Sequence, residues 1–306
     1  MTGGRNWRGF RTGRAALAAL LRHRGIRRLW LPAYVCANLA DGAGGCDIAW
    51  YSTGDRMDAA PDVFEGVRPG DAVVVIDYFG RSPAQAMRQA AQNRNVLWIE
   101  DRAQAMAPDA APFGEVILHS PRKLWGVGDG GILVGDDLPE PAGSDNPDVF
   151  IPNDLRAADP DGLDPSPWFD AFRTREAAFD ARPLPVSMRT VDTLKSIDPA
   201  REIAARKNNW TVLAAALPDI ALWPPAVADF APLAFPVVVN DAAALSAHMA
   251  EHRVWCARHW AELPSPQGFA AEHALSRKCL SLPLDGRYDS GDMERIVATL
   301  RKYYPR

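Results

Sequence analysis

The residue types best suited to chemistry lie in two short segments, each of which follows an apolar run. Asp101 ends the first run, and Gln104 follows it three residues later. Ser120 ends the second run, and Lys123 comes three residues later, at the entrance to a glycine-rich turn. A partly buried lysine loses proton affinity and becomes a nucleophile that can form a Schiff base with a carbonyl compound. The spacing therefore predicts a lysine nucleophile with a carboxylate nearby.

Pyridoxal 5'-phosphate (PLP) is a carbonyl cofactor whose requirements match these residues. It needs a lysine for its aldehyde, a carboxylate that keeps the pyridine nitrogen protonated, and a hydrogen-bond donor for its phenolic oxygen. Lys123, Asp101 and Gln104 could fill these three roles in that order. We therefore expect a PLP site built around the two segments, with Lys123 and Asp101 as the catalytic residues.

The phosphate group of such a cofactor requires hydroxyl and amide donors. Ser120 offers a hydroxyl close to Lys123. Thr12, Gly13 and Arg14 open a predicted helix, whose free N–H groups and positive dipole end favour an anion. The Arg14 side chain could add charge-assisted hydrogen bonds, although it could equally cover the surface of the sheet. These four residues are the predicted phosphate ligands.

Each of these features also has a simpler explanation. Taken alone, Lys123 could be a solvated loop lysine and Asp101 a helix cap. The glycine run at 126–131 does not match a phosphate loop, since no Gly-Lys-Ser/Thr follows it, and a dinucleotide site would need a preceding strand and an opening helix. His248 and His252 could share a metal ion, but the sequence shows no third ligand. We therefore expect two surface histidines and no metal site.

Short apolar runs alternate with helical patterns from Thr12 to Asp137, which predicts an α/β fold with a mostly parallel sheet covered on both faces. The predicted strands are Leu29–Leu31, Asp47–Tyr51, Ala72–Asp77, Val96–Glu100, Val116–His119 and Ile132–Val134. The predicted helices are Gly13–His23, Cys36–Asp41 and Pro83–Gln92. Ligands bind beyond the carboxyl ends of the strands in such sheets. Asp101 and Ser120 are placed at that edge.

The chain after this region divides into two parts. Residues 139–168 are rich in proline and acidic residues and lack an apolar period, which predicts an excursion from the core, either a lid or a disordered loop. The predicted elements beyond it are helices at Ile203–Leu217 and Ala242–His252, a strand at Phe235–Val239, and a last helix capped by Asp289 or Ser290. We predict a large domain over residues 1–197 and a smaller α+β domain over residues 198–306.

Composition limits the partners of the chain. Its 306 residues carry 34 Lys and Arg against 38 Asp and Glu, so no global basic field would attract nucleic acid or an anionic membrane. No stretch approaches the roughly 20 apolar residues of a membrane span, and the first residues lack the apolar core of a signal peptide. The four cysteines include no Cys-x-x-Cys pair, which predicts reduced thiols. We expect a cytoplasmic protein.

Four segments resemble the DegT/DnrJ/EryC1/StrS family of PLP-dependent sugar aminotransferases, which has the fold-type I architecture. They are TGRAAL at Thr12–Leu17, LPAYVCANLADGAG at Leu31–Gly44, IEDRAQA at Ile99–Ala105, and the lysine followed by DGG at Lys123–Gly131. They occur in the order found in the family and fall within the first 137 residues. The resemblance implies fold-type I for the large domain.

The resemblance also implies roles for individual residues. Lys123 would hold PLP and later move a proton, Asp101 would pair with the pyridinium, and Gln104 would lie near the phenolic oxygen. Thr12, Gly13 and Arg14 would form part of the phosphate cup. The amino donor would be glutamate or glutamine, and the acceptor a nucleotide-linked ketosugar for a surface polysaccharide or a secondary metabolite. Family members are usually homodimers, so the resemblance implies a homodimer here.

The sequence departs from the family at several positions. Leu118 stands where a phosphate-binding serine is common, while Ser120 matches the spacing of the broader aspartate aminotransferase group. Cys36 stands where an aromatic residue commonly stacks on the cofactor ring, with Tyr34 as the other candidate. The family segment with an Asn-Arg pair that reaches into the neighbouring subunit's site has no clear match here, and the nearest candidate is Ser187–Leu194. These departures bear on substrate identity more than on the cofactor.

Two other functions stay open at this point. The first is a PLP-dependent sugar dehydratase, but the related dehydratases carry histidine in place of the lysine, so Lys123 argues against it. The second is a catalytically silent α/β binding or regulatory protein that keeps the fold, which the missing counterpart of the inter-subunit segment leaves open. A bound PLP chromophore and nitrogen transfer would separate these functions from an aminotransferase.

Overall fold

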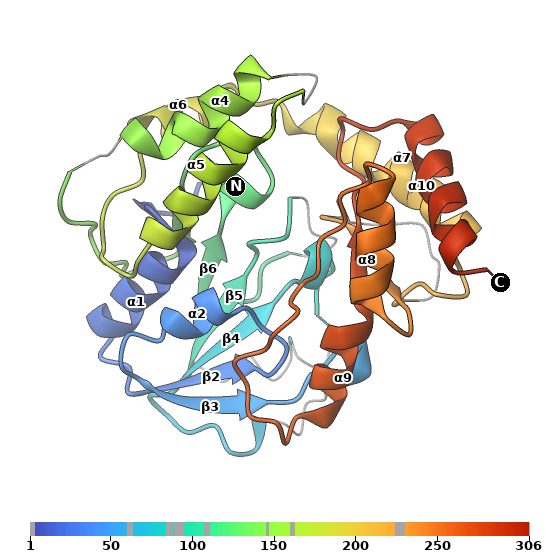
Figure 1. The fold of residues 1–306 in the computed structure, drawn as a ribbon. Helices are drawn as coiled ribbons and strands as arrows, with labels where there is room; N and C mark the ends of the chain where they lie inside the picture. Colours follow the sequence, from blue (N-terminus) through green and yellow to red (C-terminus); the bar gives the residue numbers. More distant parts are fainter. Residues whose placement is uncertain are drawn as a thin grey trace.

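The computed structural model places one large mixed sheet at the centre of the molecule (Figure 1). It describes residues 4–59, 64–83, 88, 95–106, 111–144, 147–159, 163–223 and 230–305. The seven strands lie in the order β1-β7-β6-β5-β4-β2-β3. Their bounds are β1 (Trp7–Phe10), β2 (Arg28–Pro32), β3 (Asp47–Tyr51), β4 (Ala72–Ile76), β5 (Leu97–Asp101), β6 (Val116–His119) and β7 (Gly131–Val134).

Strands β2 to β6 run parallel, while β7 pairs antiparallel with both β6 and β1. This arrangement confirms the predicted mostly parallel sheet. The predicted bounds of β3 and β6 agree with the structure, and those of β2, β4, β5 and β7 shift by one residue at one or both ends. Strand β1 was not predicted, because its four residues carry no apolar run and it is defined by pairing with β7.

The central strands are buried on both faces, as the continuous apolar runs predict. All five residues of β4 and of β5 are buried. On β4, Val74 and Ile76 belong to the main hydrophobic cluster, whereas Val73 and Val75 pack on the opposite face with Trp98. This alternation follows the two-residue period of a strand.

Helix α1 (Gly13–His23) and the short helix α2 (Ala37–Asp41) lie on one face of the sheet (Figure 1). The predicted bounds of α1 are confirmed. Its amino terminus is capped by Thr12, whose Oγ1 accepts a hydrogen bond from the N–H of Ala15 at 3.1 Å. Gly25 follows the helix with φ +63°, a left-handed conformation that favours glycine. The helix predicted at Pro83–Gln92 falls largely outside the described residues.

Helices α4 (Ile151–Ala158), α5 (Ser166–Ala178) and α6 (Met188–Ser196) form a group at the top of the view in Figure 1. The expectation of a loop without regular structure over residues 139–168 was wrong, because α4 and the start of α5 fall within that segment, while a role as a lid stays a prediction. Pro152 is the one buried residue of α4, and none of the thirteen described residues of α5 is buried. Helices that bury so little need no apolar period, which is why the sequence pattern missed them.

In the carboxyl-terminal part, the described residues form a two-stranded antiparallel sheet and four helices. The elements are α7 (Pro199–Ala216), β8 (Phe235–Val238), α8 (Ala242–Glu251), α9 (Ala270–Lys278), β9 (Cys279–Leu282) and α10 (Ser290–Tyr303). The predictions of α7, β8, α8 and α10 are confirmed, and the Asp289 side chain caps α10 in a capping box. Helix α9 and strand β9 were not predicted.

One hydrophobic cluster extends from α1 and the large sheet into α7, β8 and α10. The proposed boundary between residues 197 and 198 falls just before α7, which begins at Pro199 behind its cap Asp198. Because the core is continuous across this point, the division into two domains stays a prediction. Within the described residues, the search for a helix long and apolar enough to span a membrane finds none.

Candidate functional site

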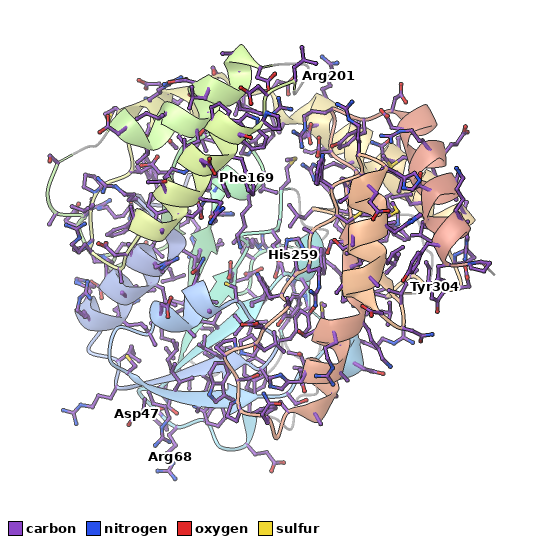
Figure 2. All side chains as sticks on the ribbon, in the orientation of Figure 1. Asp47, Arg68, Phe169, Arg201, His259 and Tyr304 are labelled. Atoms are coloured by element: carbon purple, nitrogen blue, oxygen red, sulfur yellow. The ribbon has the colours of Figure 1, made fainter. Side chains whose placement is uncertain are left out.

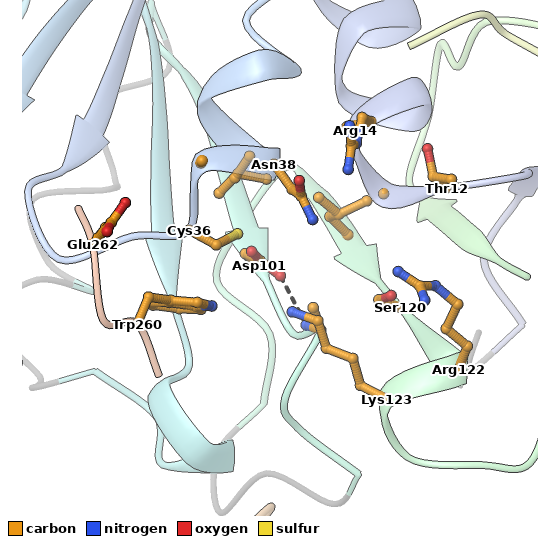
Figure 3. A pocket seen from close by; sticks show the side chains of 15 residues that line it. Thr12, Arg14, Cys36, Asn38, Asp101, Ser120, Arg122, Lys123, Trp260 and Glu262 are labelled. Carbon is orange, nitrogen blue, oxygen red and sulfur yellow. Dashed lines mark hydrogen bonds between the residues drawn. The ribbon is translucent and has the colours of Figure 1, made fainter. Parts of the chain in front are cut away.

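The carboxyl ends of the parallel strands open onto a cavity of about 330 Å³ (Figure 3). Strand β5 ends at Asp101, Ser120 follows β6, and Lys123 ends the short 3-10 helix that comes next. Seven of the eight predicted site residues line this cavity: Thr12, Gly13, Arg14, Cys36, Asp101, Ser120 and Lys123. The fold thus brings together residues that lie more than one hundred positions apart in the sequence.

Asp101 is a buried carboxylate with one fixed oxygen. Its Oδ1 accepts a hydrogen bond from the N–H of Ala103 at 2.8 Å, and the residue is 5% exposed. Burial raises the pKa of Asp101, and the nearby Lys123 charge together with the Ala103 N–H opposes this rise. A carboxylate in this environment is stabilised by a cation that enters the cavity. A protonated ring nitrogen is such a cation.

Lys123 projects into the same cavity from the other side (Figure 3). Among the described residues, none forms a hydrogen bond with its amine or an ion pair within 4.0 Å of it. Its positive charge opposes the rise that burial causes in the pKa of Cys36 and Asp101, and it adds to the lowering of the pKa of His259 by burial. The residue is exposed to the cavity, whereas a partly buried lysine was expected. The amine is therefore accessible to a carbonyl compound that enters the cavity.

The first turn of α1 forms one end of the cavity. The Thr12 Oγ1 also lies 3.3 Å from the carbonyl oxygen of Asp180, which fixes the start of the helix. A side-chain carbon added at Gly13 would meet no atom within 4 Å, so the backbone there is open toward the cavity. Arg14 donates to the carbonyl oxygen of Phe179 at 3.3 Å. An anion that entered this end of the cavity would meet the free N–H groups of the helix terminus.

Arg122 is a second cation at this end, and the sequence analysis did not identify it. Its Nη1 donates to Glu176 at 2.5 Å, and its guanidinium lies over the Phe179 ring at 5.1 Å. Ser120 lines the cavity beside it, with Oγ 3.5 Å from the carbonyl oxygen of Gly130. The only sequence signal for Arg122 was its position next to Lys123. Its contribution depends on α5, which supplies Glu176.

The structure separates the two candidates for a contact with a ring in the cavity. Cys36 lines the cavity, and burial raises the pKa of its thiol. Tyr34 is fully buried in the hydrophobic core, and its hydroxyl donates to the carbonyl oxygen of His259. Tyr34 is therefore a core residue that anchors a distant loop, and Cys36 is the residue placed beside the cavity.

Gln104 does not belong to the described lining of the cavity. It is 2% exposed, and its Oε1 accepts a hydrogen bond from the N–H of Phe79 at 2.7 Å. Phe79 has φ +55°, a strained conformation for a residue with a bulky side chain. Gln104 therefore holds the turn after β4 in place. Its contact with a phenolic oxygen stays a prediction.

The segment Ser187–Leu194 forms most of α6, and its first residues bind within the same chain. The Ser187 and Thr190 hydroxyls both donate to the Asp129 carboxylate, at 2.8 and 2.5 Å, and all three residues are buried. Arg189 pairs with Asp154 on α4. A role of this segment in a neighbouring subunit stays a prediction.

The carboxyl-terminal part supplies a wall of the cavity that the sequence analysis missed. Trp260 and Glu262 line it, across from α1 (Figure 3). Figure 2 places His259 between the sheet and the carboxyl-terminal helices. Its Nδ1 lies 2.9 Å from Ser281 Oγ, and burial together with the Lys123 charge lowers its pKa to about 4. His259 is therefore neutral at physiological pH.

Comparison with known proteins gives a fold and no closer relationship. No family model matches the chain, and no curated protein matches it by sequence. A DegT DnrJ EryC1 StrS aminotransferase from Brucella abortus aligns over 100% of this chain and 87% of its own, with TM-score 0.69 and 16% identity. NtdA from Bacillus subtilis, solved with bound cofactor PMP, aligns over 99% of this chain and 74% of its own, with TM-score 0.67 and 13% identity.

A third solved structure with this fold is a GDP-4-keto-6-deoxymannose-3-dehydratase named ColD. It aligns over 98% of this chain and 89% of its own, with TM-score 0.68 and 11% identity. These likenesses confirm the predicted fold-type I architecture. Because enzymes with different reactions share this fold, the fold alone does not assign a reaction to this chain.

Proposed function

We propose that this chain is a PLP-dependent aminotransferase that binds its cofactor on Lys123. The observation that carries the proposal is that the accessible amine of Lys123 and the buried carboxylate of Asp101 open onto one cavity. The opening turn of α1 stands at the end of the same cavity. A cofactor with an aldehyde, a basic ring nitrogen and a phosphate matches these three features. The PMP bound to NtdA, which has the same fold, supports this choice.

Asp101 would hold a proton on the ring nitrogen. Burial disfavours its negative charge, and a cationic ring nitrogen placed beside Asp101 would stabilise that charge. When bound, PLP supplies an electron-accepting ring that spreads the negative charge formed at a substrate α-carbon. The hydrogen bond from the Ala103 N–H would keep the Asp101 carboxylate oriented toward the ring nitrogen.

Lys123 would serve as general base and acid once a substrate amine has displaced it from the cofactor. Its side chain reaches the cavity from a 3-10 helix that is closed by the Lys123 N–H and the carbonyl oxygen of Ser120, at 3.1 Å. A free amine at this position would be able to accept a proton from the donor's α-carbon and return it at a second, neighbouring atom in the cavity. Because the amine is without an ion-pair partner among the described residues, it can move between these two points.

The phosphate would be bound by the first amides of α1, the Thr12 and Ser120 hydroxyls, and the cations Arg14 and Arg122. Backbone N–H groups at a helix start bind anions without a side chain, which suits the open backbone at Gly13. Cys36 would lie against the ring. Gln104 would act through the turn that it holds, or through its amide nitrogen.

The substrates that we propose are glutamate or glutamine as amino donor and a nucleotide-linked ketosugar as acceptor, used by a homodimer. The solved structures with this fold support a sugar acceptor, since they include a sugar aminotransferase, CalS13 from Micromonospora echinospora. The ColD dehydratase also acts on a nucleotide-linked sugar, as its name states. The choice of glutamate or glutamine and the homodimer come from the family resemblance.

The test begins with purified protein that is incubated with PLP, after which unbound PLP is removed. We expect a visible absorbance band from the bound cofactor, which shifts toward the band of the amino form when glutamate or glutamine is added. In Lys123→Ala, the absorbance band should lie at a different wavelength, and it should not shift when an amino acid is added. Lys302→Ala, which changes a lysine of α10 outside the described cavity lining, is the matched control and should behave like the wild type.

The outcomes also separate the other functions. A protein that remains colourless with excess PLP would be a binding or regulatory protein with this fold. A coloured protein that transfers nitrogen from no amino acid, and instead removes a hydroxyl group from a nucleotide-linked sugar, would be a dehydratase. Either result would overturn the proposed aminotransferase.

A further inference from the structure

Three side chains of types that can bind metal ions meet at the end of α8. They are His248, Glu251 and His252. A ring nitrogen of each histidine and a carboxylate oxygen of Glu251 all lie within 4.8 Å of one another. The histidine spacing alone gave only two ligands, and the structure adds the carboxylate. None of the three belongs to the described lining of the cofactor cavity.

We propose that these three residues form a binding site for a divalent zinc ion. Two imidazoles and one carboxylate are a ligand set that zinc uses in proteins, with water in the fourth position. Imidazole nitrogen favours zinc and its transition-metal neighbours over magnesium and calcium, which prefer oxygen. The site would be unrelated to the proposed amino-group transfer.

Both imidazoles are held in a state that leaves one nitrogen available. His248 Nε2 lies 3.2 Å from the carbonyl oxygen of Thr299, and His252 Nδ1 lies 2.9 Å from the carbonyl oxygen of His248. A carbonyl oxygen only accepts, so each of these nitrogens carries the hydrogen. In the neutral ring the other nitrogen then keeps a lone pair. Metal-binding histidines show this pattern, since a second hydrogen bond fixes their tautomer and orientation.

The neighbouring helix α10 helps to order the first ligand. Helices α8 and α10 lie side by side in Figure 1 and pack together. The His248 ring is half-buried against Tyr303 of α10, with ring centroids 5.0 Å apart, and against His252 at 4.5 Å. Glu251 and His252 are exposed. An ion can therefore enter from solvent and find one ligand already in place, which reduces the entropy cost of binding.

Zinc binding would require only a small movement of the three side chains. Zinc lies about 2.0 Å from its nitrogen and oxygen ligands, which places the ligand atoms of a tetrahedral site about 3.3 Å apart. The three donor atoms lie within 4.8 Å of one another, so rotations about side-chain bonds can bring them together. All three residues are on one helical turn and its end, where positions three and four apart are neighbours.

One positive charge opposes the ion. Arg295 on α10 donates from Nη1 to the carbonyl oxygen of His252 at 3.4 Å. Its charge is partly offset by Asp292, whose carboxylate lies 3.9 Å from Nη2. We therefore expect weaker binding than at structural zinc sites with four protein ligands.

The test uses the full-length protein after treatment with a chelator and removal of the chelator. Zinc is titrated in competition with a chromophoric indicator, and thermal unfolding is measured with and without zinc. We expect one zinc ion per chain and a higher melting temperature with zinc, because an ion that binds the folded state stabilises it. His252→Ala should weaken binding by more than about tenfold, and Glu251→Gln by a smaller factor.

His23→Ala is the matched control, because His23 is a surface histidine on α1 that pairs with Asp137. It should bind zinc like the wild type. Since Glu251 and His252 are exposed, their substitutions should leave the fold intact, which circular dichroism checks. The proposal is overturned if the wild type binds no zinc, or if His252→Ala and Glu251→Gln bind it as tightly as the wild type. The latter result would locate the zinc elsewhere, for example on the cysteines.

Discussion

The proposed cofactor cavity has two walls of different origin. The sheet edge carries Asp101 and Lys123, which stand next to regular strands and could be located from the sequence. The opposite wall carries Trp260 and Glu262, which lie in an irregular segment between α8 and α9. The positions of the groups proposed to react are therefore set by the ends of nearby strands. The positions of the groups on the opposite wall are set by tertiary packing.

The largest effect is expected from Asp101→Asn on the sheet edge. The amide can still accept the hydrogen bond from the Ala103 N–H but cannot balance a protonated ring nitrogen. The rate of reaction of the PLP form with the amino donor should fall by at least about 100-fold, the effect of losing a preorganised electrostatic contact. Stopped-flow absorbance measures this rate.

The cofactor-free Asp101→Asn protein should be as stable as the wild type or more stable. Burial raises the pKa of Asp101, so its charge is disfavoured in the folded protein at neutral pH, and the substitution removes that charge. Chemical denaturation of both proteins tests this.

The rate of reaction with the amino donor gives a separate test. An Asp101→Asn protein that reacts at the wild-type rate would show that Asp101 does not contact the ring.

The second-largest effect is a pH dependence of the free energy of unfolding, and we expect it from His119 at the end of β6. Burial and Arg102 lower its pKa to about 4, whereas an unfolded histidine titrates near 6.5. A lowered pKa contributes stability that is present above the unfolded value and is lost as the pH falls toward the folded value. This loss amounts to about 3 kcal/mol between pH 6.5 and pH 4.

His119→Gln should reduce the acid sensitivity of the free energy of unfolding by about that amount, on the order of 3 kcal/mol. Urea unfolding at a series of pH values measures it. His259 belongs to the opposite wall and has a pKa of about 4 for a similar reason, so His259→Gln should act in the same direction. An unchanged pH profile in His119→Gln would mean that folding does not lower the pKa of His119.

The opposite wall should show smaller effects on cofactor binding. Trp260→Ala removes the aromatic side chain that lines the cavity near Cys36, and we expect PLP to bind about fivefold more weakly, the scale of one aromatic contact. Trp260→Phe should restore most of the affinity. Trp255→Ala is the control, because Trp255 lies on the same segment and is 73% exposed. Equal affinities for all variants would place the cofactor away from this wall.

The smallest effect is expected from Glu262→Gln. Glu262 is exposed, and its charge is screened by solvent. Removing this negative charge should lower the KM for an anionic nucleotide-linked sugar by about twofold to threefold at low salt, with no effect at high salt. Steady-state kinetics at two ionic strengths checks this. A large increase in KM would instead mean that Glu262 binds the acceptor directly.

The strands and the sheet-edge residues could be predicted because their signal is local. Asp101 and Ser120 come directly after apolar runs, and the direction of a parallel strand then fixes where their side chains lie. Thr12 and Gly13 were recognised from the helix that they open. The local pattern also placed Gln104 near the site, but it could not show that Phe79 engages the side-chain oxygen of Gln104.

The opposite wall could not be predicted because its position depends on contacts that are distant in the sequence. The Tyr34 hydroxyl binds the carbonyl oxygen of His259, 225 positions away, and Ser276 Oγ binds the carbonyl oxygen of Trp260 at 2.7 Å. Neither contact leaves a period or a motif in the segment itself. Helices α4 and α5 were missed for the related reason that they bury few side chains.

The pairing of Lys123 with the proposed cofactor is tested most directly by reductive trapping. The protein is incubated with PLP, reduced with borohydride and digested, and the modified peptide is identified by mass spectrometry. The five lysines of the chain are Lys123, Lys195, Lys207, Lys278 and Lys302. The account predicts a stoichiometric pyridoxyl mass on Lys123. A pyridoxyl mass on another lysine, or spread over several, would contradict it.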